Sequence, residues 1–110
     1  GMMTSDWLRD DATVVAVDYA SLCGSSVAAE AALFLVDDRD QFLANRDAGQ
    51  FDGYPDPGAT LGEAILAGRT RPATGRVLVT HLGVGLADVV FARAIVERAI
   101  DLGLGVPLER

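Results

Sequence analysis

Three side chains of this sequence have the chemistry for a catalytic site: Asp18, Cys23 and His81. Asp18 follows an apolar segment that we expect to form a strand, and ligand crevices of α/β proteins open at the carboxyl ends of strands. A carboxylate there could act as a general acid or base if its pKa were raised and a substrate lay within reach. The alternative is an aspartate that only forms the turn after the strand.

Cys23 and His81 are the only cysteine and the only histidine of the chain. A cysteine beside a histidine can act as an activated nucleophile, although the sequence shows no third residue that would orient the imidazole. A histidine that packs or caps at a strand end is the alternative that we favour. Because the chain has no cluster of cysteines and histidines, we expect no metal site.

The chain contains no lysine, because all nine of its basic residues are arginines. This composition excludes Schiff-base chemistry, a P-loop lysine and a lysine acid or base. The segment Gly83-Val84-Gly85 is similar to the start of a G-x-G-x-x-G phosphate turn, but the third glycine is absent and Asp88 stands there instead. Since Asp88 already compensates the dipole of the helix expected next, we predict a close-packed strand-to-helix turn.

Two groups of charges could bind ions. The acidic run 37–40 is typical of a metal site, but Asp38 followed three residues later by Gln41 also predicts a capping box at a helix start, which we favour. The second group could bind a phosphate or a carboxylate, with solvated charges or salt bridges to a partner as the favoured alternative. It consists of Arg69, Arg71 and Arg76.

Short apolar segments alternate with helical patterns, which predicts an α/β fold with a mainly parallel sheet of three to four strands, like half of a Rossmann domain. The expected strands are 13–17, 32–36 and 76–80. Residues 22–29 are expected to form a loop or a short helix. The expected helices are 38–48, ended by Gly49; the helix opened by the Thr60-x-x-Glu63 capping box and ended by Gly68; and 86–102, ended by Gly103.

The helix expected over 86–102 is apolar around most of its circumference. Its polar residues Arg93, Glu97, Arg98 and Asp101 are expected on one narrow arc, since 93, 97 and 101 are spaced by four. One small sheet face cannot cover the remaining apolar surface. We therefore expect this helix to pack on its own sheet and also on another chain, most simply as a homodimer.

Length, composition and charge indicate the general class of protein to which the chain belongs. Its 110 residues, half of them hydrophobic, are expected to form a single domain over 2–110, with Gly1 as a tag-cleavage scar. A net charge of -7 argues against nonspecific binding to nucleic acid or to an anionic membrane. No apolar run approaches the ~20 residues that span a bilayer. The lone cysteine and the absence of a visible secretory signal predict a cytoplasmic protein.

Four segments carry further motifs in a fixed order. They are D-W-L-R-D-D-A-T-V-V-A-V at 6–17, L-F-L-V-D-D-R-D-Q at 33–41, L-G-E-A-I-L-A-G-R-T at 61–70 and H-L-G-V-G-L-A-D-V at 81–89, with G-L-G at 103–105 after the long helix. Their order and spacing resemble the C-terminal third of the ornithine cyclodeaminase/μ-crystallin family. The family patterns are W-L-x-x-G-x-x-V-x-x-V, V-V-V-D-x-x-x-Q, L-G-E-x-x-x-G-x-x-x-G-R-x and S-x-G-x-A-x-x-D-V.

The resemblance implies roles for three residues. The catalytic aspartate of the family follows the strand that corresponds to 13–17, so Asp18 takes this role and a place near the dinucleotide. A serine that contacts NAD(P) in the family corresponds to His81, and the neighbouring substrate-contacting position corresponds to Leu82. The family's lysine-containing glycine-rich stretch is shortened here to Y-A-S-L-C-G-S-S. The first βαβ unit, the phosphate loop and the substrate lysine and arginine have no counterpart.

These observations lead us to expect a truncated relative of this family that acts as a self-associating binding or interaction module without complete catalytic machinery. Its expected partner is a second copy, through helix 86–102, or a separately encoded N-terminal half. The alternative is an NAD(H)-dependent cyclodeaminase or imine reductase, assembled with a second chain or across an oligomer, in which Asp18 handles water and proton transfer. A gene fragment without a selected function is the third possibility.

Overall fold

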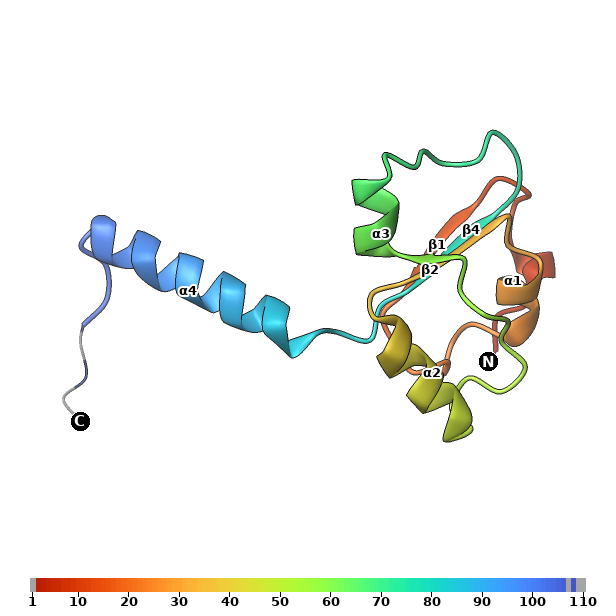
Figure 1. Ribbon diagram of the computed structural model, residues 1–110, viewed down its shortest axis with the longest axis horizontal. Coiled ribbons are helices and arrows are strands. Elements are labelled where there is room, and N and C mark those ends of the chain that lie inside the picture. The colour runs from red at the N-terminus through yellow and green to blue at the C-terminus, as the bar shows by residue number, and fades with distance from the viewer. Residues whose placement is uncertain (1, 107, 109–110) are drawn as a thin grey trace.

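The computed structural model of the chain describes residues 2–106 and 108, so the other positions of the expected domain 2–110 lie outside the described residues. The strands β1 (Thr13–Ala16), β2 (Leu33–Val36), β3 (Ala59–Thr60) and β4 (Val77–Thr80) form one parallel sheet in the order β1-β4-β2-β3 (Figure 1). The helices are a 3-10 helix (Ser5–Trp7), α1 (Ser25–Ala29), α2 (Arg39–Asp47), α3 (Leu61–Leu66) and α4 (Gly85–Asp101). The expected α/β fold with a small parallel sheet is confirmed.

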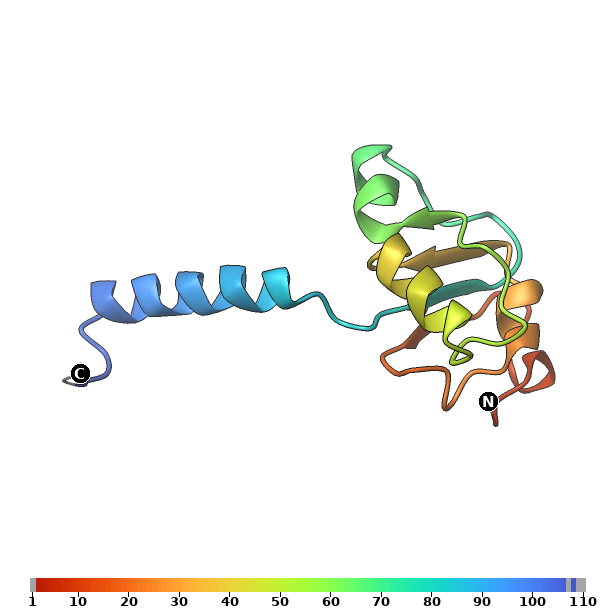
Figure 2. The ribbon, with the colours of Figure 1, turned by 60° about the horizontal axis from the view of Figure 1, so that its bottom comes forward.

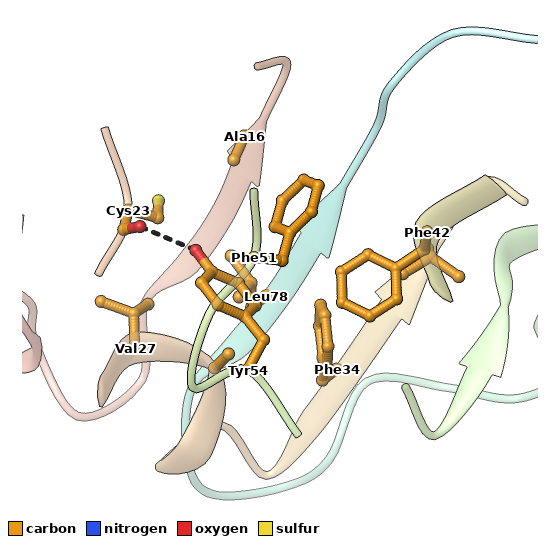
Figure 3. Close-up of a cluster of buried hydrophobic side chains, with 10 residues drawn as sticks. Ala16, Cys23, Val27, Phe34, Phe42, Phe51, Tyr54 and Leu78 are labelled. Carbon is orange, nitrogen blue, oxygen red and sulfur yellow. Dashed lines mark hydrogen bonds between the residues drawn. The ribbon is translucent and has the colours of Figure 1, made fainter. Parts of the chain in front are cut away.

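The first face of the sheet is covered by α1, by α2 and by the loop after α2. Its centre is an aromatic cluster in which the Phe42 ring lies 5.5 Å from that of Phe34 and 4.9 Å from that of Phe51 (Figure 3). The Tyr54 ring packs edge-on against Phe51, and its hydroxyl donates a 2.7 Å hydrogen bond to the carbonyl oxygen of Cys23. Burial raises the pKa of Tyr54, so this hydroxyl keeps its proton and remains a donor.

At the start of α2, one of the two hydrogen bonds of the expected capping box is present. The Asp38 carboxylate accepts the Gln41 N–H at 2.8 Å, as a helix cap does. The reciprocal bond is replaced, because the Asp38 N–H donates to Asp37 Oδ1 at 2.9 Å. Gln41 Oε1 is consequently buried without a partner among the described residues.

Thr60 joins the sheet to α3. It ends β3, a two-residue strand that the sequence does not reveal, where Val36 pairs with Thr60. Thr60 also begins α3 with the expected capping box: its hydroxyl accepts the Glu63 N–H at 3.1 Å, and Glu63 Oε2 accepts the Thr60 N–H at 2.7 Å. Arg39 donates to the same Glu63 oxygen at 3.0 Å, which links the starts of α2 and α3.

On the second face of the sheet, α3 covers part of the surface and leaves β1 exposed. Ala64 of α3 packs in a cluster with Leu35 and Val79. The parallel register places Val15 of β1 beside Val79, hence on this same face. Val15 is nevertheless 60% exposed, and Val17, two residues further along, is 74% exposed. We call the row formed by Thr13, Val15 and Val17 the open β1 face.

Helix α4 does not pack on its own sheet, so that part of the prediction is wrong. Figures 1 and 2 show α4 leaving the carboxyl end of β4 and projecting away from the sheet. None of its residues is buried. The chain measures 54 × 33 × 25 Å with a radius of gyration of 17.7 Å, whereas a compact domain of this length has about 13 Å. The connector 81–84 is tied to the sheet by the His81 N–H, which donates to the Ala16 carbonyl oxygen, and by the Gly83 N–H, which donates to Asp37.

We expect Phe42→Ala to lower the free energy of unfolding by about 3–5 kcal/mol, because the ring is fully buried at the centre of the aromatic cluster. Leu66→Ala is the control, since Leu66 is exposed on α3 and its loss should change stability by about 0.5 kcal/mol or less. Urea unfolding at one fixed chain concentration measures both. Equal effects of the two substitutions would contradict the assignment of the core.

Candidate functional site

The topology brings three sequence-predicted residues to one edge of the sheet. Asp18 follows β1, His81 follows β4 and Asp37 follows β2, and these three strands are neighbours in the order β1-β4-β2. All three residues therefore lie at the carboxyl edge, where α/β proteins bind ligands. Whether these residues form a site depends on the hydrogen bonds and contacts that each side chain makes.

The Asp18 carboxylate is engaged within its own turn. Oδ2 accepts hydrogen bonds from the Ser21 hydroxyl and, at 2.8 Å, from the Leu22 N–H. The hydrogen bond from Ser21 lowers the pKa of Asp18 below its ordinary value. Ala20 in this turn has φ 58°, in the left-handed region that favours glycine. Asp18 thus has the ionisation and the bonds of a turn-forming aspartate, and it lacks the raised pKa that a general acid needs at neutral pH.

Asp37 connects β2 to the connector that leads into α4. Its side chain is only 6% exposed, and its Oδ2 accepts the Gly83 N–H at 2.7 Å. The same oxygen lies 3.6 Å from Nδ1 of His81, whose side chain is 45% exposed. The sequence placed Asp37 in the acidic run 37–40, as part of a metal site or, the favoured alternative, of a helix start. Its position directly after a buried strand was the available signal for a role at the carboxyl edge.

The proposed pairing of Cys23 with His81 has no support in the described residues. Cys23 is 1% exposed and packs in the first-face core beside Val27 and Ala28. Burial raises the pKa of its thiol, so the thiolate that a nucleophile requires is disfavoured. His81 contacts Asp37 instead.

The start of α4 does not fit a dinucleotide by itself. Val84 caps the helix without a side-chain hydrogen bond, and Asp88 lies in the first turn, where its charge opposes that of a phosphate. Leu82, the expected substrate contact, is partly buried and packs against the first-face core. His81 and Asp18 come to the same edge, but the described residues supply no phosphate-binding loop beside them.

Two residues of the arginine group, Arg71 and Arg76, make structural hydrogen bonds. Arg76 bonds to Asp10 at 3.0 Å and to Glu30 at 3.3 Å, and its side chain is only 15% exposed. It also donates to the carbonyl oxygens of Leu8 and Arg9, each at 3.1 Å, which fastens the N-terminal segment to the edge of the sheet. Arg71 donates to the Asp11 carbonyl oxygen. The acidic run is likewise occupied by capping, and the described residues hold no group of three His, Cys, Asp or Glu that could bind a metal ion.

The largest unpartnered surface of the described chain is apolar and lies on α4. Phe91, Ile95 and Leu102 line a hollow of about 390 Å³ together with Leu104, which returns along the helix because its N–H donates to the Ala99 carbonyl oxygen at 2.8 Å. Over the same described part of the chain, no helix has the length and apolarity needed to cross a membrane.

Comparison of the chain with family models, with curated proteins and with solved structures finds no match.

The pKa of Asp18 predicts how the Asp18→Asn variant depends on pH. A lowered pKa means that the carboxylate stabilises the fold above its ordinary value of 3.8 and that this contribution is lost as the pH falls through the folded value. We expect the variant to lose about 1 kcal/mol at pH 7, the difference between charged and neutral hydrogen bonds. The loss should shrink near pH 3, and Asp52→Asn, at an exposed loop position, is the charge-matched control. A loss independent of pH in urea unfolding would contradict this account.

Proposed function

We propose that the chain is a self-associating interaction module whose contact surface is α4. The observation that carries this proposal is the exposure of nine large apolar side chains along 86–104, each more than half exposed. They include Phe91 at 68%, Ile95 at 67% and Ile100 at 71%. Monomeric proteins rarely expose a contiguous apolar patch of this extent. A helix of this kind requires a partner.

The area of this surface can be compared with that of a stable interface. Burying one such side chain removes roughly 60–120 Å² of apolar surface from water, as its transfer free energy implies. The nine side chains lie around the helix and together offer roughly 500–1,000 Å² per chain, of which one side enters a single interface; a standard interface buries about 800 Å² per partner. Arg93 and Glu97 pair with each other at 2.8 Å on the polar stripe of the helix. Ile95 and Leu102 lie on the opposite side, where Asp88 is the charged residue of the first turn.

The family relationship is part of this proposal. A relative of the C-terminal portion of the ornithine cyclodeaminase/μ-crystallin family would keep the parallel sheet and the long helix while lacking the first βαβ unit. In favour of the enzyme alternative, Asp18 and His81 follow neighbouring strands and reach the same edge. That alternative needs a second chain to supply the phosphate-binding loop, so it also depends on association. Association is therefore the function that we place first.

Two substitutions on α4 test the proposal. Ile95→Arg places a charge in the apolar surface, and we expect it to weaken self-association at least about 30-fold, as the loss of an interface hot spot does. Asp101→Arg is the matched control, because Asp101 lies on the polar stripe at the end of the helix, where a basic residue is tolerated. Sedimentation velocity at tens of micromolar should give the unaltered chain and the control twice the 11.5 kDa of one chain.

A single-chain mass for all three proteins would overturn the proposal. Circular dichroism of each variant verifies that the helix content is unchanged, so that a loss of mass reports a loss of contact. If the Ile95→Arg variant kept the mass of two chains, the contact between the copies would not lie on α4.

A further inference from the structure

The open β1 face is the second unpartnered apolar surface of the chain, and it complements α4. Parallel sheets are covered by helices on both faces. On the second face α3 packs with Leu35 and Val79, while Val15 and Val17 remain exposed. One helix is thus missing from this face. Among the described elements, α4 is the only helix whose residues all remain unburied.

The connector between β4 and α4 is held in a form that directs α4 away from its own sheet. The His81 N–H donates to the Ala16 carbonyl oxygen at 2.8 Å, which continues the pairing of β4 with β1 by one residue. Two residues later, the Gly83 N–H donates to the buried Asp37 carboxylate at 2.7 Å. Gly83 has φ 90°, a conformation that glycine adopts readily and other residues rarely do. The bond between Asp37 and Gly83 and the conformation of Gly83 together set the direction in which the chain enters α4.

We propose that α4 of each chain covers the open β1 face of a second copy, so that two copies exchange their long helices. This proposal rests on the proposed function and names the surface that α4 occupies. Each chain carries both halves of the contact, so a symmetric pair satisfies both surfaces at once. The side chains of Thr13, Val15 and Val17 carry no charge, and Arg71 borders this face because it donates to the Thr13 hydroxyl at 3.4 Å. On the exchanged helix the stripe of Arg93, Glu97 and Asp101 remains on the water side, whereas Asp88 of the first turn lies on the opposite side.

The dimensions agree with this arrangement. A helix of 17 residues is about 25 Å long, and a strand of four residues is about 13 Å long. Helix α4 therefore spans the full length of β1 and extends beyond it. The exchange withdraws Val15 and Val17, together with one apolar side of α4, from water in both copies.

Disulfide trapping between differently substituted copies tests the exchange. One copy carries Val15→Cys on the open β1 face, and the other carries Ala92→Cys or Ala99→Cys on the side of α4 opposite the polar stripe. The two are mixed in urea, refolded together and oxidised, and one copy bears a short tag so that mixed pairs are distinguished by mass. Cys23 is buried and remains in every copy. We expect a mixed species of two chains from the α4 variants and none from Asp101→Cys, the control on the polar stripe.

Three other outcomes would each contradict the exchange and would indicate a different arrangement of α4. A disulfide only between two α4 cysteines would mean that the helices pair with each other, which refutes the exchange but retains self-association. An intrachain disulfide in the Val15→Cys/Ala99→Cys double variant, without mixed pairs, would mean that α4 returns to its own sheet. Absence of every disulfide, together with a single-chain mass of the unaltered protein, would refute the exchange and the proposed function together.

Discussion

The requirement that a parallel sheet bury both of its faces governs this structure. The first face meets it with α1, α2 and the aromatic cluster around Phe42. The second face meets it over β2, β3 and β4, through α3, and leaves Val15 of β1 in water. Helix α4 is apolar enough to complete this face, but the chain directs it outward. The shape of the molecule, its exposed surfaces and its expected association all follow from this separation.

A single buried carboxylate links the sheet to the outward helix. Asp37 lies at the end of a central strand, starts α2 through the Asp38 N–H and holds the connector through the Gly83 N–H. A carboxylate with this little exposure requires hydrogen-bond partners, and these two amides supply them. The direction of α4 is therefore coupled to the centre of the sheet, while the carboxyl edge keeps His81 partly accessible.

Local patterns predicted most of the elements, because their causes are local. The Thr60 capping box, the Asp38 cap and the three longer strands depend on residues within a few positions of each other. The strand order and β3 depend on pairing between distant segments, which periodicity does not report. The direction of α4 depends on Asp37 and Gly83, which are 46 positions apart, so the expectation that α4 packs on its own sheet was wrong.

The candidate site was predictable to a similar extent. Asp18 and His81 could be placed at strand ends from the sequence, and the topology brings them to one edge. Their partners could not be predicted: the Ser21 hydroxyl bonds to Asp18, and Asp37 lies beside His81. The wide apolar surface of helix 86–102 was predictable because amphipathicity is a property of one element, and its expected partner remains a prediction.

Small-angle X-ray scattering from the unaltered chain at tens of micromolar tests the central claim most directly, because it gives the mass and the radius of gyration of one sample. Association of two copies through α4 predicts a mass of twice 11.5 kDa. A single-chain mass with a radius near 13 Å, the value for a compact domain of this length, would show that α4 folds back on its own sheet. A single-chain mass with a radius near 17.7 Å would show that α4 remains without a partner, and either result would contradict the account.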